Sequence, residues 1–284
     1  MLEAAKHNFL IGVHCEDEEI ISAMEIDARS SGNNSVRDFL CAHPPISEEK
    51  AVDMVLEAAE ISGARVHICH ATLPSVVRKV TAAKSRGIKA TVETCPHYLI
   101  FTEDDLEKQQ GFLKCTPPVR KQDDVEGMWE MLLSGKIDIV SSDHSPSTLS
   151  QKVSPRGNFW DVWGGVTGVQ TLLPILFNYG VIKRGLGIEE LAQLTSTKAA
   201  KIFGLWPQKG AIAVGCDADF SVFDPVAKWT VSQEKLFYKN KHTPYHGMEI
   251  TGKVVMTFVR GKCVFDNGVI NLIHGKLLDC NKKN

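Results

Sequence analysis

The chain has 284 residues, 43% of them hydrophobic, and its 32 basic and 34 acidic side chains give a net charge of −2. A chain of this length and apolar content can bury a large core, so we expect a globular protein. The balanced charge argues against nucleic acid or a membrane surface as partner and favours a small-molecule ligand. No apolar run reaches the ~18 residues of a membrane span, and the first residues lack a secretion signal, so we expect a cytoplasmic protein, with an organelle not excluded.

Eight cysteines are spread along the chain without a Cys-x-x-Cys pair. This spacing favours reduced thiols over a disulfide framework or a structural zinc site. Cys15, Cys69 and Cys95 lie near histidines, but we interpret them as small buried hydrophobic residues rather than catalytic thiols.

The first half of the chain alternates apolar runs with amphipathic segments. In order, the pattern predicts a helix over 2–7, a strand over 9–13, a helix over 16–29, a loop over 32–45, a helix from Ser47 to Gly63, a strand from Arg65, a helix over 74–86, a strand over 88–93, a helix over 122–134 and a strand over 137–142. The predicted apolar stripe of the helix from Ser47 comprises Ala51, Met54, Val55 and Ala58. Four strands alternating with helices at this spacing predict a parallel sheet with crossover helices, whose ligands bind beyond the carboxyl ends of the strands.

The second half of the chain has a different pattern of predicted elements. A loop rich in Pro, Gly and aromatic residues over 155–165 precedes two predicted helices, over 166–179 and 188–203. Short strand signals separated by turns then follow over 217–224, 254–259 and 262–265. We therefore predict an α/β domain over residues 1–204 and a β-rich domain over 205–284, with a polar, frayed tail at 279–284.

Three polar side chains follow predicted strands: His14, His70 and Asp143, the last within the sequence IVSSDHSP at 139–146. Because parallel strands end at one edge of a sheet, we expect these side chains to lie close together. Two imidazoles and a carboxylate suit a cation such as zinc, and a bound metal lowers the pKa of water to ~7. A single histidine at a strand end is more often structural, but three such ends favour a shared metal site with Asp143 as the catalytic carboxylate.

Other polar residues of this region each have a structural alternative. His97, in a Cys-Pro-His-Tyr turn, and His144, next to the strand-end aspartate, either support the metal ligands or stabilise their turns. Thr116, beside two prolines, and Trp163–Gly164, in a glycine-rich turn, either contact a substrate or form ordinary turns. His67 is expected to contact the helix layer.

Eight motifs occur along the chain: HCED at 14–17, HICHAT at 67–72, ETCPHYL at 93–99, KCTPPVR at 114–120, SSDHSP at 141–146, WGGVTG at 163–168, AAKIFGL at 199–205 and KGAIAVGCDADF at 209–220. Together and in this order they resemble the cyclic amidohydrolases, which include dihydroorotases, hydantoinases and allantoinases. TCPHY, KCTPPVR, the tryptophan-glycine-glycine turn and NKHTPYHG at 240–247 most resemble allantoinases.

The resemblance implies a (β/α)8 TIM barrel flanked by a small β-sandwich, and hydrolysis of the ring amide of allantoin to allantoate in purine degradation. It implies that His14 and His70 ligate one metal of a zinc pair, while Asp143 ligates the other and carries a proton to the leaving nitrogen. Thr116 and Trp163–Gly164 stand where relatives contact the ring. A homo-oligomer is expected for the full-length form.

Two parts of the family pattern have no match here: the His-x-His pair of the first barrel strand and the lysine that bridges the two metals. The resemblance therefore implies barrel strands five to eight and part of the sandwich, with one zinc ion or none in this chain, which would leave the chain inactive by itself. Three alternatives stay open: hydantoinase or dihydropyrimidinase activity, dihydroorotase activity, and a non-catalytic scaffold that assembles with partners.

Overall fold

The computed structural model of the protein describes residues 1–154, 157–272 and 274–278. These residues form two compact units: unit 1 comprises Met1–Val169 and Gln233–Pro244, and unit 2 comprises Gln170–Ser232 and the described residues from Tyr245 onward. The domain division between residues 204 and 205 stays a prediction. The predicted tail at 279–284, with Cys280, lies outside the described residues, as do residues 155 and 156 of the predicted loop.

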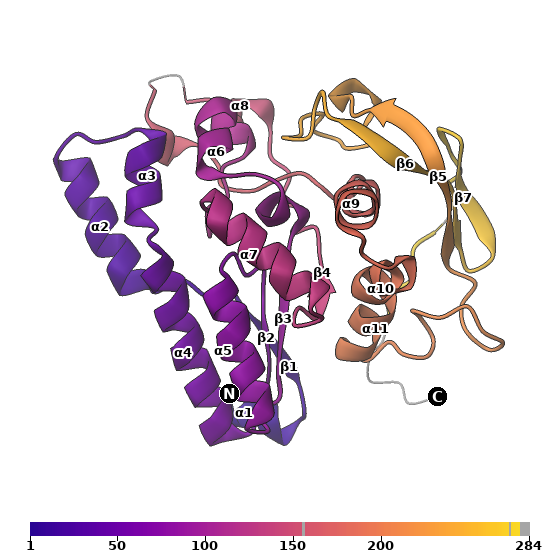
Figure 1. The fold of residues 1–284 in the computed structure, drawn as a ribbon, viewed down its shortest axis with the longest axis horizontal. Helices are drawn as coiled ribbons and strands as arrows, with labels where there is room; N and C mark the ends of the chain where they lie inside the picture. Colours follow the sequence, from indigo (N-terminus) through magenta and orange to yellow (C-terminus); the bar gives the residue numbers. More distant parts are fainter. Residues whose placement is uncertain (155–156, 273, 279–284) are drawn as a thin grey trace. The chain divides into compact units, whose positions relative to one another are not determined.

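A parallel four-stranded sheet forms the centre of unit 1 (Figure 1). Its strands follow the order of the sequence: β1 (Leu10–Val13), β2 (Arg65–Ile68), β3 (Ala90–Thr94) and β4 (Ile139–Val140). Gly12 is paired with His67, and His67 with Thr91. The predicted parallel α/β arrangement is therefore present, and the carboxyl ends of all four strands lie at one edge.

Three long helices lie along one face of this sheet in Figure 1: α4 (Pro45–Ser62), α5 (Pro74–Ser85) and α7 (Gln122–Leu133). The strand side chains on that face are apolar and buried, as Val66 and Val92 show with 0% exposure. Asp138, just before β4, accepts a hydrogen bond from Val92 N and pairs with Lys84 of α5 at 2.6 Å. The main core of unit 1 therefore lies between the sheet and these helices.

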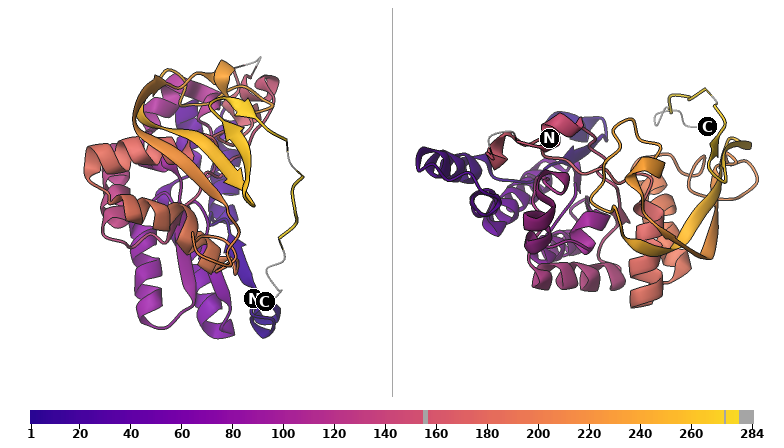
Figure 2. Two further views of the ribbon diagram at one scale, coloured as in Figure 1. Left: turned by 90° about the vertical axis from the view of Figure 1, so that its right-hand side faces the viewer. Right: turned by 90° about the horizontal axis from the view of Figure 1, so that it is seen from above.

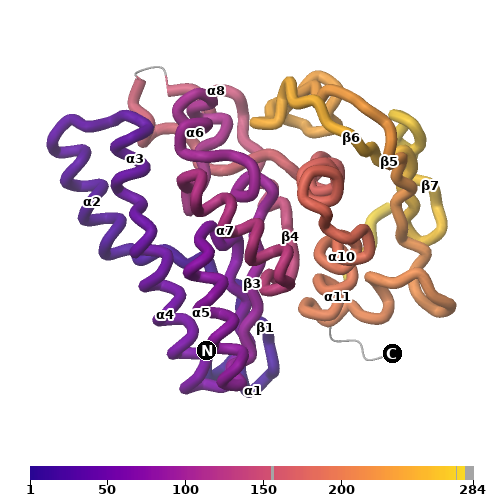
Figure 3. The backbone as a smooth tube through the Cα atoms, in the orientation of Figure 1, coloured from indigo at the N-terminus to yellow at the C-terminus, as the bar shows by residue number. Residues whose placement is uncertain are grey.

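Residues predicted as a loop over 32–45 contain the helix α3 (Val36–Ala42), so that prediction is wrong. Ser35 and Asp38 form a capping box, in which each side chain accepts from the backbone of the other, and this starts the helix. α3 runs beside α2 (Glu18–Ser30) (Figure 3). The remaining elements of unit 1 are α1 (Leu2–Lys6), η1 (Pro96–Leu99), α6 (Glu103–Gln109), η2 (Gln110–Phe112), α8 (Leu149–Lys152), η3 (Phe159–Asp161) and η6 (Gln233–Lys235).

The predicted apolar stripe of the next helix is also wrong. α4 begins at Pro45, before the predicted start at Ser47, and Met54 of the stripe is 57% exposed. The helix instead buries Val52 and Leu56, which are 0% and 5% exposed. The segment offers apolar residues on more than one side, so packing against the sheet, rather than periodicity alone, decides which side is buried.

The opposite face of the parallel sheet carries polar side chains. His67 Nδ1 lies 2.7 Å from Thr91 Oγ1, and His67 Nε2 lies 3.2 Å from Glu93 Oε2. The prediction that His67 contacts the helix layer is therefore wrong. Side chains alternate along a strand, and Val66 and Ile68 occupy the helix side, which leaves His67 for the other face.

Unit 2 contains α9 (Leu172–Leu176), η4 (Phe177–Ile182), α10 (Ile188–Ala192), η5 (Gln193–Thr197) and α11 (Lys198–Ile202), where η4 and η5 are π-helical. Its antiparallel sheet has the order β5 (Phe220–Thr230), β6 (Glu249–Val259), β7 (Lys262–Asp266) and β8 (Val269–Ile270) (Figure 2). Phe177 packs on Phe223 with ring centroids 4.8 Å apart, which joins the helical segment to the sheet.

The helix predicted over 166–179 begins later, at Leu172. Val166 instead forms a parallel β-bridge with His144, which lies in the loop after β4. Among the described residues, no helix is both long and apolar enough to span a membrane.

Candidate metal centre

His14 and His70 lie next to each other at the carboxyl ends of β1 and β2. The two strands are in register, with Val13 beside Ile68, so the residues that follow start from the same level of the sheet. His14 Nδ1 lies 3.3 Å from His70 Nε2, and the ring centroids are 4.9 Å apart. The fold therefore brings together two side chains that are 56 positions apart in the sequence.

Glu16 holds the outer nitrogen of His14. His14 Nε2 lies 3.0 Å from Glu16 Oε2, and the Glu16 side chain is 4% exposed. Because a carboxylate only accepts hydrogen bonds, Nε2 carries the proton of the neutral imidazole, and the Nδ1 lone pair faces His70. The bond to Glu16 raises the pKa of His14, against the opposing effect of burial. Sequence reasoning missed Glu16, although its two-residue spacing from His14 was a usable signal.

His70 is the more deeply buried of the two histidines. Burial lowers the pKa of His70, and this effect outweighs the negative charge of Asp143, which acts in the opposite direction. Its Nδ1 atom is buried and has no hydrogen-bond partner within the described part of the chain. The neutral imidazole that burial favours is the form that binds a metal ion.

The two facing nitrogens fit a shared metal ion. Two nitrogens of a tetrahedral site with metal–nitrogen bonds of ~2.05 Å lie about 3.3 Å apart, and His14 Nδ1 and His70 Nε2 are 3.3 Å apart. A carboxylate behind a histidine, as Glu16 provides, is common in metal sites. In residues 1–154, 157–272 and 274–278, however, no group of three or more His, Cys, Asp and Glu side chains is arranged to hold a metal ion. The structure thus brings together two of the three predicted ligands.

Asp143 lies in the loop after β4 with a backbone φ of +41°, which is uncommon for a residue other than glycine. Ser141 N donates to Thr94 O at 3.0 Å, so the pairing of β3 with the chain after β4 continues to within two residues of Asp143. The negative charge of Asp143 acts to raise the pKa of both His14 and His70. Asp143 therefore lies within electrostatic reach of the histidine pair.

Glu93 connects the polar face of the sheet to the same loop. Burial raises its pKa, but the hydrogen bonds with His67 and Ser141 and the charge of His67 outweigh burial, so the pKa of Glu93 lies below its ordinary value. The carboxylate is therefore ionised at neutral pH. Sequence reasoning gave Glu93 no role, although strand alternation places it on the face of Thr91.

The thiols near the histidines are protonated at neutral pH. Burial raises the pKa of Cys15 and Cys115 to about 12 and that of Cys69 to about 11, and it raises the pKa of Cys95 well above its ordinary value. All described cysteines are free. These properties match small buried residues rather than nucleophiles or metal ligands.

His97 lies in η1, directly after β3, and is 1% exposed. Burial lowers the pKa of His97 to about 3, so the ring is neutral. Neither ring nitrogen has a hydrogen-bond partner among the described residues, and the ring lies against Tyr98 with centroids 4.1 Å apart. A role of His97 in supporting the metal ligands stays a prediction.

The segments that carry the predicted substrate contacts lie side by side. Thr116 is exposed in the loop over 114–120, and Trp163 is 47% exposed in the turn over 163–168, where Gly164 is exposed as well. Gly165 N donates to Lys114 O at 2.7 Å, which joins the turn to the loop. Contact of Thr116, Trp163 and Gly164 with a substrate stays a prediction.

Two buried lysines, Lys114 and Lys152, donate hydrogen bonds to backbone carbonyls just before this turn and at its start. Lys114 Nζ donates to the carbonyl oxygens of Phe159 at 2.7 Å and Val162 at 2.8 Å. Lys152 Nζ donates to Trp163 O at 3.0 Å. Burial lowers the pKa of each lysine to about 8. Their charges are therefore held by backbone carbonyls.

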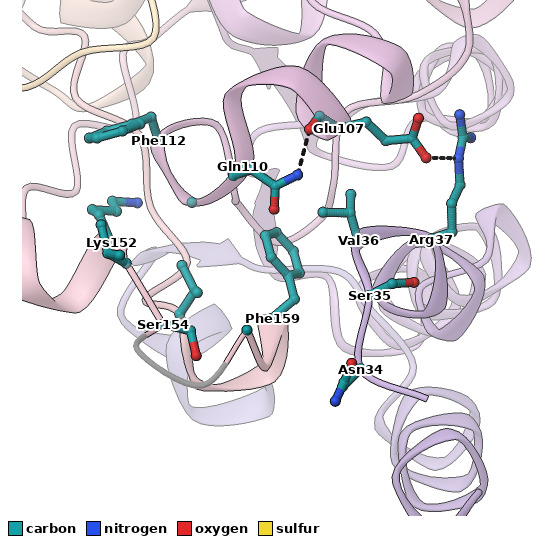
Figure 4. A pocket seen from close by; sticks show the side chains of 14 residues that line it. Asn34, Ser35, Val36, Arg37, Glu107, Gln110, Phe112, Lys152, Ser154 and Phe159 are labelled. Atoms are coloured by element: carbon teal, nitrogen blue, oxygen red, sulfur yellow. Dashed lines mark hydrogen bonds and ion pairs between the residues drawn. The ribbon is translucent and has the colours of Figure 1, made fainter. Parts of the chain in front are cut away.

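A cavity of about 520 Å³ lies between the start of α3, the end of α6 with η2, and residues of the segments 152–154 and 157–162 (Figure 4). The residues labelled there are Asn34, Ser35, Val36, Arg37, Glu107, Gln110, Phe112, Lys152, Ser154 and Phe159. Arg37 extends along one side and pairs with Glu107 and, at 2.8 Å, with Asp104. His14, His70 and Asp143 are not among the lining residues, so this cavity is separate from the histidine pair.

Comparison with known proteins gives consistent matches. Residues 1–264 match the family described as "Amidohydrolase family". An allantoinase from Escherichia coli O139:H28 (strain E24377A / ETEC) is 37% identical over 254 residues, which cover 89% of this chain and 55% of that protein. An allantoinase from Escherichia coli O9:H4 (strain HS) is 38% identical with the same coverage. The chain spans about half the length of the curated relatives it matches.

Solved structures are similar over nearly the whole chain. The L-hydantoinase (dihydropyrimidinase) from Arthrobacter aurescens has a TM-score of 0.92 and 32% sequence identity, covering 95% of this chain and 60% of that chain. The dihydropyrimidinase from Brevibacillus agri NCHU1002 has a TM-score of 0.91 and 31% identity, covering 95% and 59%.

Proposed function

Because this chain belongs to the amidohydrolase family, we propose that it serves in the metal-dependent hydrolysis of a cyclic amide, with allantoin as substrate and allantoate as product. The observation that carries the proposal is the separation of 3.3 Å between His14 Nδ1 and His70 Nε2. Glu16, which accepts from the far nitrogen of His14, supports the same reading. The chain spans about half the length of its curated relatives, so the complete reaction is proposed for a form, called full-length here, that also spans the rest of their length.

The side chains would divide the work as follows. His14 and His70 would hold a zinc ion together with Asp143, and Glu16 would fix the ring orientation of His14. A bound zinc ion supplies a water of lowered pKa and polarises an amide carbonyl. Asp143 would carry a proton to the leaving nitrogen, whose departure opens the ring.

Substrate recognition is assigned to Thr116 and Trp163–Gly164. The exposed indole of Trp163 offers a flat apolar surface to a ring, and the absence of a side chain at Gly164 lets a ligand approach the backbone. Sequence similarity to proteins named allantoinase makes allantoin the first candidate substrate. The hydantoinase and dihydropyrimidinase structures make hydantoin and dihydrouracil the second candidates.

Metal binding by the protein tests the first part of the proposal. Equilibrium dialysis against Co²⁺ should show one high-affinity ion per chain, with a visible spectrum that His14→Ala and His70→Ala abolish. His7→Ala is the matched control, because His7 is exposed and its described contacts are the pair with Glu3, at 3.2 Å, and stacking on Phe9. Equal Co²⁺ binding by all three variants would refute the assignment of the ligands.

Competing turnover tests the substrate. The zinc-loaded chain and a full-length form should be offered allantoin, hydantoin, dihydrouracil and dihydroorotate at equal concentrations, with ring opening followed by mass spectrometry. We expect allantoin to have the highest kcat/KM in the full-length form. Preference for another ring would reject allantoin, and stoichiometric zinc without turnover of any ring would favour the non-catalytic scaffold.

A further inference from the structure

One segment of unit 1 comes from far along the chain. Residues 233–244, which we call the strap, belong to unit 1, whereas the residues on both sides of them belong to unit 2. Its side chains Tyr238, His242 and Thr243 are 8%, 3% and 4% exposed. The strap is therefore built into unit 1 rather than lying on its surface.

The strap is bonded to two loops at once. His242 Nε2 donates to Ser147 O at 2.8 Å, in the loop that follows Asp143. Thr167 Oγ1 donates to His242 O at 2.5 Å, and Thr243 Oγ1 donates to Thr167 O at 3.1 Å, in the turn over 163–168. Thr167 is 0% exposed, so these bonds are shielded from water.

The two loops are also joined directly beneath the strap. His144 forms a parallel β-bridge with Val166, and Ser145 N donates to Val166 O at 2.9 Å. His144 Nδ1 accepts from Gly168 N at 3.2 Å, and its ring packs on Tyr238 of the strap with centroids 4.7 Å apart. The imidazole of His144 thus connects all three segments.

These contacts fix the spacing of two groups that the proposed function assigns to the reaction. One loop begins at Asp143, the proposed proton carrier, and the turn begins at Trp163–Gly164, the proposed ring contact. The strap contacts described above are with residues that follow each of these groups. A misplacement of 1 Å between reacting groups costs rate on the order of 100-fold.

We infer that the strap is a positioning element that sets which ring size the site accepts. By holding the loop of Asp143 against the turn of Trp163, the strap would fix the distance between the proton carrier and the ring contact at the value that the five-membered ring of allantoin or hydantoin requires. A loosened strap would let the loops separate, so the six-membered ring of dihydrouracil would be discriminated against less. This inference rests on the proposed function.

The test compares three strap variants in the zinc-loaded full-length form. His242→Leu removes the donor to Ser147, Thr243→Val removes the donor to Thr167, and His242→Gln keeps a nitrogen donor near the position of Nε2. Thr81→Val is the matched control, since its hydroxyl donates to Val77 O at 2.8 Å within α5, away from both loops.

We expect His242→Leu and Thr243→Val to lower kcat/KM for allantoin about 10- to 100-fold and to reduce the preference for allantoin over dihydrouracil. His242→Gln should restore most of both quantities, and Thr81→Val should leave the preference at the wild-type value. Every variant should still bind Co²⁺ through His14 and His70, because no strap contact described above involves either histidine, and any loss of Co²⁺ affinity would report displacement of Asp143, the third proposed ligand. A merely structural role would lower the active fraction equally for all rings.

Two outcomes separate failure of the inference from failure of the proposed function. An active wild type whose ring preference is unchanged in folded Thr243→Val and His242→Leu overturns the strap inference alone. A wild type that binds Co²⁺ but opens no cyclic amide overturns the proposed function, and the strap inference with it. Circular dichroism shows which variants are folded. If His242→Leu is not folded, the ring preference of Thr243→Val, whose side chain keeps the shape of threonine, decides the test.

Discussion

Glu48 Oε2 and Arg120 Nη2 are 3.1 Å apart in a fully buried ion pair that joins the start of α4 to the loop carrying Thr116. Thr72, after β2, donates to the same carboxylate through its backbone N–H at 2.9 Å, and Arg120 Nε donates to the Thr72 hydroxyl at 2.9 Å. Burial raises the pKa of Glu48 even though Arg120 opposes this. Chain segments that follow three different strands are therefore held by one charge pair.

Breaking this pair should destabilise unit 1 strongly. Glu48→Gln leaves the Arg120 charge buried without its counterion, and such losses cost about 3–5 kcal/mol. Urea unfolding followed by circular dichroism measures the change. Asp53→Asn removes the exposed partner of Lys79 and should cost no more than ~1 kcal/mol. Equal midpoints for the two variants would show that the buried pair contributes no more than a surface pair.

Glu16→Gln should weaken metal binding without removing a ligand. The amide can still accept from His14 Nε2 but carries no negative charge, so His14 becomes a poorer donor, and loss of such partners typically costs 10–100-fold in affinity. Competition between the protein and a chromophoric chelator for Co²⁺ gives the affinity. Glu3→Gln, at an exposed position, is the control. A Glu16→Gln affinity equal to that of wild type would leave Glu16 as a structural residue.

The buried lysines should make stability depend on alkaline pH. The pKa of Lys114 is about 8 in the folded protein, because of burial, and ~10.4 in the unfolded chain. Between these values the unfolded chain binds more protons, so the contribution of Lys114 to the free energy of unfolding rises with pH; below pH ~8 it is constant. The other charges acting on Lys114 are Glu25, Arg29, Lys152 and Asp161.

Lys114→Met isolates this contribution. Unfolding of wild type and variant should be followed in parallel from pH 7 to 10, since tyrosines and thiols titrate in the same range in both proteins. The wild type should gain stability relative to the variant as pH rises through about 8 and beyond. Lys6→Met, at an exposed position, should run parallel to wild type. A constant difference between wild type and Lys114→Met would contradict the lowered pKa.

Two adjacent glycines should respond differently to alanine. Gly165 has φ +153°, and a Cβ placed there would lie 2.7 Å from Ser145 Cβ, so the turn and the loop after Asp143 would be forced apart. We expect Gly165→Ala to cost roughly 1–3 kcal/mol of stability, as overpacked substitutions do. Gly164→Ala meets nothing within 4 Å and should cost less than 1 kcal/mol on the same scale. Thermal unfolding compares the two, and equal losses would contradict the close approach.

Sequence patterns predicted those strands and helices of unit 1 in which apolar residues form a continuous run or recur at a regular spacing. The apolar strands stood out, and Gly63, with φ +69°, ended α4 as expected. The polar ends of β1 and β2 predicted that His14 and His70 lie close together, because the carboxyl ends of parallel strands lie at one edge of a sheet. α3 was missed because its Asn- and Ser-rich start reads as a loop unless the Ser35–Asp38 capping box is recognised.

The contacts around the strap had no sequence signal of comparable strength. His242 meets Ser147 across 95 positions through a single side-chain bond to a backbone carbonyl. Such bonds follow no period, because they depend on where loops happen to meet after the sheet has formed. Glu16 could have been recognised more easily, because it lies two residues after His14 in the sequence. The Glu48–Arg120 pair, by contrast, joins residues 72 positions apart.

The order of synthesis has a consequence for unit 1. Residues 1–169 are synthesised before residues 170–232 of unit 2, and the donors of His242 and Thr243 are made only after both. The hydrogen bonds of His242 and Thr243 with the loop after Asp143 and with the turn of Trp163 can therefore form only after residues 233–244 have been synthesised. A gene fragment ending at residue 169 would lack these bonds, and an independent unit 1 would need residues 233–244 attached by a new linker.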